Sequence, residues 1–133
     1  MGVALNTCCH DDRIGAAAVL SSGEIMFPGG SFHVPDPVPV LFVHGDADQT
    51  IALIFGRMAF TDAGPPKFFV TLLGADHTSA FSGPRAGVPA ADVVVRTTID
   101  FFDRYLKGRT SSLPLLRQDG AVAAVSTIDA VEK

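Results

Sequence analysis

Three apolar runs stand out along the chain: Ile14–Leu20, Val38–His44 and Lys67–Leu73. None of them alternates cleanly between apolar and polar residues, as a strand with one solvent-facing side would. Continuous apolar runs of this length are typical of strands that are buried on both faces of a sheet. The pattern therefore predicts three buried strands, the first two separated by a glycine- and proline-rich loop at residues 21–37.

Two longer stretches, residues 51–63 and 91–107, carry a helical pattern instead. The first ends at Gly64-Pro65-Pro66, and the second has Gly108 at its C-cap position. Strands separated by helices predict an α/β fold, with a parallel sheet of about three strands and helices on both faces. The second helix places five residues on one face: Val94, Thr98, Phe101, Phe102 and Tyr105.

Size and composition narrow the class of protein. The 133 residues amount to a single domain, in which residues 109–133 are mixed in pattern and expected to be a peripheral tail. Hydrophobic residues make up 47% of the chain, which is ample for a packed core. A net charge of −4 without any basic run argues against a nucleic-acid partner. No apolar run approaches the roughly 18 residues of a membrane span, and the adjacent Cys8 and Cys9 give no disulfide framework.

Charged side chains follow two of the predicted strands at the point where each strand ends. His44, Asp46 and Asp48 come after one apolar run, and Asp76 and His77 come after the next. Because parallel strands end at the same edge of a sheet, we expect Asp48 and His77 to become neighbours. A carboxylate on one imidazole nitrogen fixes the tautomer, and the other nitrogen then acts as a general base.

Two other interpretations of these residues stay open. Asp48 precedes the helix predicted at residues 51–63 and is also placed to be its N-cap. A metal site for zinc or manganese is the second alternative, although the turn implied by Gly45 disrupts the spacing that would align the ligands. Its candidate ligands are His44, Asp46, Asp48 and His77, with His33 as a further one.

The segments PVLFVHGDADQTI and PKFFVTLLGADHTSAF, together with TTIDFFDRYLKG and DRIGAAAVLSSG, resemble the C-terminal half of an α/β-hydrolase. The similar enzymes are dienelactone hydrolases, chlorophyllases and cutinase-like polyester hydrolases, and the resemblance covers about residues 1–115. It implies that Asp48 in H-G-x-x-D is the acid of a catalytic triad and that His77 in G-A-x-H is its histidine. The implied activity is carboxylic-ester hydrolysis through an acyl-enzyme, without a cofactor, on an ester-type small molecule or polymer. Phe81 is a candidate lining residue for the substrate pocket, with core packing as the alternative.

The nucleophile of such a triad is missing from the sequence. These hydrolases carry a serine in G-x-S-x-G, and the nearest segment here is Gly29-Gly30-Ser31-Phe32-His33. Only seven residues separate Ser31 from Val38, which leaves no room for the helix that follows a nucleophile elbow. Residues 1–9 resemble the end of that helix, so we expect the serine to lie upstream of Met1.

On this view the chain alone is weak or inactive as an esterase, because it also lacks the loop that would supply the oxyanion donors. The expected partner is then a complementing N-terminal half. The non-enzymatic alternative is a self-associating α/β module, in which the open sheet edge of one copy pairs with that of another to form a homo-oligomer. The sequence indicates no cellular compartment.

Overall fold

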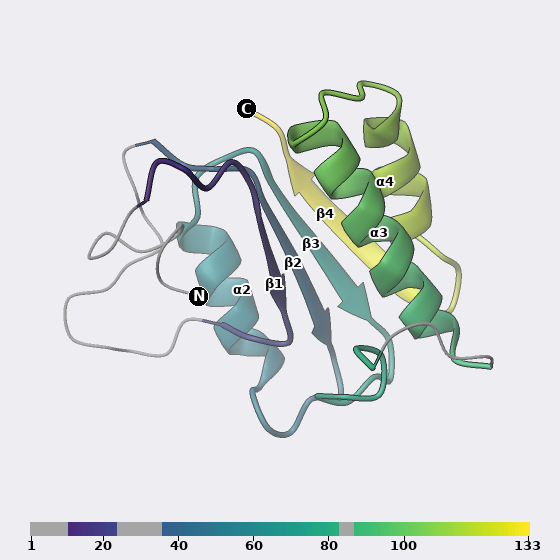
Figure 1. The fold of residues 1–133 in the computed structure, drawn as a ribbon. Helices are drawn as coiled ribbons and strands as arrows, with labels where there is room; N and C mark the ends of the chain where they lie inside the picture. Colours follow the sequence, from purple (N-terminus) through teal and green to yellow (C-terminus); the bar gives the residue numbers. More distant parts are fainter. Residues whose placement is uncertain (1–10, 24–35, 83–86) are drawn as a thin grey trace.

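The computed structural model describes residues 11–23, 36–82 and 87–133, and within them four strands form one sheet in the order β1-β2-β3-β4. The strands β1 (Ala17–Leu20), β2 (Val40–Gly45) and β3 (Lys67–Leu72) are parallel. The fourth strand, β4 (Ser126–Val131), runs antiparallel to β3. In Figure 1 the arrowheads of β1, β2 and β3 point to one edge of the sheet, and the loops that follow β2 and β3 lie together there.

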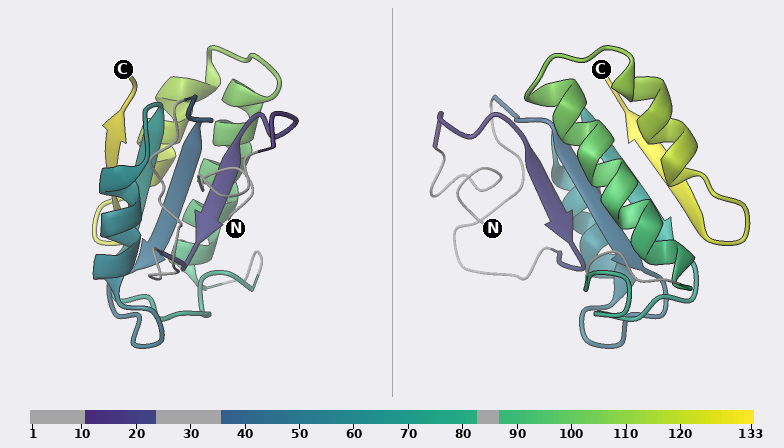
Figure 2. Two further views of the ribbon diagram at one scale, coloured as in Figure 1. Left: turned by 90° about the vertical axis from the view of Figure 1, so that its left-hand side faces the viewer. Right: turned by 45° about the vertical axis from the view of Figure 1, so that its right-hand side comes forward.

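Helices cover both faces of this sheet (Figure 2). Helix α2 (Leu53–Asp62) packs on one face through Ala59, which is fully buried. Helices α3 (Pro89–Tyr105) and α4 (Ser112–Gly120) pack together on the other face. Because β2 and β3 are buried from both sides, their sequences are continuously apolar rather than alternating.

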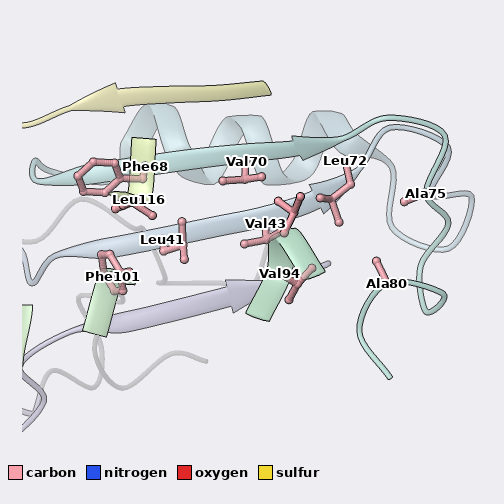
Figure 3. Close-up of a cluster of buried hydrophobic side chains, with 11 residues drawn as sticks. Leu41, Val43, Phe68, Val70, Leu72, Ala75, Ala80, Val94, Phe101 and Leu116 are labelled. Carbon is pink, nitrogen blue, oxygen red and sulfur yellow. The ribbon is translucent and has the colours of Figure 1, made fainter. Parts of the chain in front are cut away.

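The larger hydrophobic cluster lies between the sheet and the α3–α4 pair (Figure 3). Alternate residues of β2 and β3 point into it, while the intervening residues, such as Phe42 and Phe69, face α2. The ring of Phe101 on α3 is fully buried and packs edge-on against Phe68, with 6.1 Å between ring centroids. The sheet contributes Leu41, Val43, Phe68, Val70 and Leu72 to the cluster, and the helices contribute Val93, Val94, Phe101 and Leu116.

The α/β class and the parallel order of the three apolar runs are confirmed, but the sheet has a fourth strand that was not expected. Residues 109–133, expected to be a peripheral tail, contain α4 and β4. Leu116 of α4 is fully buried in the core, and Gly120 lies so close to β4 that an added Cβ would be 2.7 Å from the side chain of Ile128. β4 escaped prediction because most of its side chains are exposed, which leaves no apolar run.

The buried side of α3 differs from its predicted apolar face. Thr97 rather than Thr98 is fully buried, and its hydroxyl donates a hydrogen bond to the carbonyl of Val93 at 2.7 Å. Two carboxylates, Asp100 and Asp103, are buried on the same helix. Across the described residues, none of the helices is both long and apolar enough to cross a membrane. The helix end expected at residues 1–9 lies outside the described residues.

Candidate acid–histidine site

The loops after β2 and β3 are held together by their backbones. The amide of Asp46 donates to the carbonyl of Leu72 at 3.0 Å, and the amide of Ala47 donates to the carbonyl of Ala75 at 3.1 Å. At Gly45 the two loops come so close that an added Cβ would lie 2.1 Å from the carbonyl oxygen of Ala75. Glycine is therefore required at this position by the close approach of the two chains.

This approach brings Asp48 and His77 together, as the sequence predicts. Nδ1 of His77 lies 2.8 Å from Oδ2 of Asp48, although the residues are 29 positions apart. Because a carboxylate only accepts, Nδ1 carries the proton and Nε2 is left as the basic nitrogen. The Asp48 side chain is fully buried, whereas that of His77 is 31% exposed. A buried acid thus orients an imidazole that solvent reaches.

Asp48 also closes the turn that leads toward α2. Its Oδ1 accepts hydrogen bonds from the amides of Thr50 at 2.8 Å and Ile51 at 2.9 Å. The helix itself begins at Leu53, and its N-cap is Ala52, which makes no side-chain cap. The N-cap interpretation of Asp48 is therefore wrong in detail. One carboxylate oxygen holds the turn before the helix, and the other oxygen holds the histidine.

These contacts keep Asp48 ionised. Burial raises the pKa of its carboxyl, but hydrogen bonds from Ser21, Ile51, His77 and Thr50 together outweigh the burial and hold the pKa well below its ordinary value. Four donor atoms therefore hold a negative charge next to Nδ1 of the imidazole. Such a charge stabilises the imidazolium that forms when Nε2 takes up a proton.

His44 is buried next to Asp48 and does not reach the surface of the site. It is 1% exposed, and its Nε2 lies 2.8 Å from the carbonyl of Ile51 and 3.3 Å from Oδ2 of Asp48. The carbonyl is an acceptor, so Nε2 carries a proton and donates it to this hydrogen bond. Nδ1 is buried without a hydrogen-bond partner, next to Gly56, where an added Cβ would come within 2.7 Å of it. The His44 ring thus holds the turn that Asp48 closes, through its contact with the carbonyl of Ile51.

The other residues that the sequence singled out in these loops make hydrogen bonds to the loop backbone or pack against the core. Asp46 is exposed, and its Oδ1 accepts from the amide of Gly74 at 2.6 Å, which adds a third link between the loops. Asp76 accepts from the amides of Ser79 and Thr78, and these hydrogen bonds lower the pKa of its carboxyl. Phe81 is half-buried against the larger hydrophobic cluster, so its role in a substrate pocket stays a prediction.

Ser21 belongs to the site but was not predicted there. It directly follows β1, its amide donates to the carbonyl of Val43 at 2.8 Å, and its hydroxyl donates to Oδ2 of Asp48 at 2.6 Å. Its backbone is left-handed, with φ of 46°, and the residue is 5% exposed. One signal was available in the sequence, because Ser21 ends the first apolar run and therefore lies at the same sheet edge as Asp48.

Several remaining candidates lie outside the described residues, namely Ser31, His33, Cys8 and Cys9. Within residues 11–23, 36–82 and 87–133, no group of three or more His, Cys, Asp or Glu side chains is arranged to hold a metal ion.

The described residues of the helices line surface hollows away from the acid–histidine pair. One of about 200 Å³ is lined by residues of α3 together with Asp119 and Val122, and one of about 260 Å³ is lined by residues of α2. Neither Asp48 nor His77 is among the residues that line them.

Comparison with known proteins finds no match, either to a family model or to a curated protein. The resemblance to α/β-hydrolases stays an expectation from the sequence segments quoted above.

Proposed function

We propose that this chain is the C-terminal portion of an α/β-hydrolase of the dienelactone hydrolase, chlorophyllase and cutinase-like group, in which Asp48 and His77 are the acid and base of a catalytic triad. The reaction is carboxylic-ester hydrolysis, and no cofactor takes part in it. The observation that carries the proposal is the 2.8 Å contact between a buried, ionised carboxylate and the Nδ1 of a partly exposed histidine.

The proposed chemistry follows from that contact. Nε2 of His77 accepts the proton of an attacking hydroxyl, and Asp48 stabilises the resulting imidazolium. The proton then passes to the leaving alcohol. Ser21 does not supply the hydroxyl, because its Oγ contacts Asp48 on the acid side of the histidine. In this proposal the nucleophile comes from outside the described residues, as part of a complementing N-terminal half.

The test combines ester turnover with labelling of nucleophiles. Hydrolysis of p-nitrophenyl acetate is compared between the wild-type chain and the variants His77→Ala, Asp48→Asn and Asp46→Asn. Asp46→Asn is the matched control, because Asp46 stands in the same loop but contacts a backbone amide instead of the histidine. In parallel, each protein is treated with a fluorophosphonate probe, and the labelled peptides are identified by mass spectrometry.

We expect hydrolysis by His77 acting on water to be slow but measurable and to fall on the order of 100-fold in His77→Ala, the usual contribution of a positioned base. Asp48→Asn is expected to lose most of the rate and Asp46→Asn to keep it. Equal rates in the wild type and His77→Ala that lie clearly above the buffer background, from folded proteins, would contradict the proposal. A serine adduct that disappears in His77→Ala would support the acid–base pair and would show that the chain holds its own nucleophile.

The non-catalytic alternative, a self-associating module, is favoured by one edge of the sheet. Among the described strands β1 pairs with β2 alone, and Leu20 at its end is 41% exposed. Helix α2 adds Ile54 and Phe55, which are 58% and 42% exposed. Analytical ultracentrifugation of the wild type and Leu20→Lys tests this module. A dimer that dissociates in the variant would support it, and a wild-type monomer at high concentration would contradict it.

A further inference from the structure

We propose that Ser21 is a positioning residue of the Asp48–His77 pair, and that its hydroxyl sets how strongly Asp48 binds the proton of the histidine. This inference deepens the proposed function and rests on it for its catalytic meaning. The contact itself is structural, so it is testable without any turnover.

The argument begins with the distribution of donors around Asp48. Oδ1 accepts two backbone amides, from Thr50 and Ile51, and these fix the orientation of the carboxylate. Oδ2 accepts the hydroxyl of Ser21 at 2.6 Å and Nδ1–H of His77 at 2.8 Å. Ser21 and His77 therefore share one oxygen, and Nε2 of His44 lies 3.3 Å from the same oxygen. The hydrogen bonds from Ser21 and His77 weaken each other because they use the same acceptor.

Ser21 is held in place for this contact by its own backbone. Its amide is bonded to β2 through the carbonyl of Val43, and its φ of 46° turns the chain away from the sheet directly after β1. A serine pays a conformational cost in this left-handed region, where glycine would be relaxed. The residue is also 5% exposed, so water does not compete for the hydroxyl. A strained, buried serine that reaches an ionised acid indicates a role beyond filling space.

The expected consequence concerns where the shared proton resides. The hydroxyl lowers the proton affinity of Oδ2, which keeps the proton on Nδ1 of His77 and leaves Nε2 unprotonated and basic. Removal of the hydroxyl leaves the carboxylate in place, because Oδ1 still holds both amides. It concentrates more negative charge on Oδ2, and the hydrogen bond from Nδ1–H to that oxygen becomes shorter and stronger.

The experiment uses proton NMR of the full chain at pH 7 and follows the Nδ1–H resonance of His77, assigned with His77→Gln. Ser21→Ala removes the hydroxyl, and Ser21→Cys keeps a side chain of similar size with only a weak donor. Ser22→Ala is the matched control, since it removes the half-buried hydroxyl of the next residue. Thermal unfolding of each protein establishes that it is folded at the temperature of the spectra, and the cysteine variant retains the packing if the alanine variant does not fold.

We expect the resonance to move downfield in both Ser21 variants and to keep its position in Ser22→Ala. A pure packing role predicts a wild-type spectrum for Ser21→Cys, and that result would overturn the inference. An upfield shift or an unchanged resonance in both variants would overturn it as well. The readout needs no substrate, so the Ser21 contact and the esterase proposal are able to fail separately. A downfield shift together with hydrolysis that is independent of His77 would sustain the contact and reject the catalysis.

Discussion

A substitution at the buried carboxyl of Asp100 is expected to change the stability of this protein in a way that depends on pH. The residue lies on α3, it is 9% exposed, and its Oδ2 is buried without a hydrogen-bond partner. Burial, followed by the nearby carboxylates of Asp119 on α4 and Asp103, raises its pKa to about 6, and Arg96 opposes the rise. The substitution Asp100→Asn replaces this acid with a neutral amide of the same shape.

The sign of the effect follows from proton linkage. The pKa of Asp100 is about 6 when folded and 3.8 ordinarily, so the folded protein binds the proton more tightly than the unfolded chain. The protonated Asp100 stabilises the folded protein fully at pH values below 3.8, its pKa in the unfolded chain, and this stabilisation is lost as the pH rises through about 6. At about 1.4 kcal/mol per pKa unit, the difference of about 2 units amounts to about 3 kcal/mol.

The assay is urea unfolding of the wild type and Asp100→Asn at several values between pH 4 and pH 8. We expect the smallest difference in the free energy of unfolding at pH 4, where Asp100 of the folded wild type is neutral like the amide of the variant. The variant should then become more stable than the wild type as the pH rises, by about 3 kcal/mol at pH 8. Differences between the two proteins are compared because carboxylates that are distant from Asp100 titrate equally in both.

The exposed Asp36 supplies the control, and Asp36→Asn is expected to follow the wild type throughout. The reasoning would be refuted by a difference between the wild type and Asp100→Asn that stays constant with pH. A variant that becomes less stable than the wild type at pH 8 would refute it equally, because the ionised carboxylate would then be a net favourable contact.

Three further outcomes are expected. Asp48→Asn should have a lower free energy of unfolding than the wild type at pH 7, and the difference should narrow in acid. The pKa of Asp48 is lower in the folded protein than in the unfolded chain, so the carboxylate stabilises the fold above the unfolded pKa, and this stabilisation is lost toward low pH. Urea unfolding at pH 7 and pH 3 checks this, and a difference that does not change with pH would contradict it. Phe101→Ala should lower the free energy of unfolding, measured in urea, by about 3–5 kcal/mol, since the ring is fully buried. A decrease below about 1 kcal/mol would show that neighbouring side chains fill the space that the ring leaves. Gly45→Ala should lose about 3 kcal/mol and shift the His77 resonance, because its Cβ would collide with the carbonyl of Ala75, and an unchanged spectrum would contradict the close approach.

Much of the site could be predicted because it depends on strand order. The three apolar runs identify parallel buried strands, and the residues after them must then meet at one edge of the sheet. That argument alone places Asp48 beside His77, as the 2.8 Å contact shows. The role of Gly45 is also local, because the motif itself contains the residue that lets the loops approach.

Other features depend on contacts that sequence patterns do not encode. β4 carries few apolar residues, and it is recognisable as a strand only because β3 offers it a free edge. Asp100 and Asp103 are buried on α3 although they are charged. Asp100 lies close to Asp119 of α4, and Asp103 pairs with Lys107 and Arg109 beyond the end of the helix. No periodicity in residues 91–107 signals that burial.

The sequence by itself determined the α/β class, the parallel order of the central strands and the acid–histidine pair, because each follows from short-range patterns and from the shared direction of parallel strands. Only the tertiary structure decided that one oxygen of Asp48 binds the turn before α2 and that the other binds both His77 and Ser21. It also decided that His44 is buried next to this carboxylate. Those choices rest on ångström-scale distances between side chains from separate strands, which packing fixes only when the whole sheet has formed.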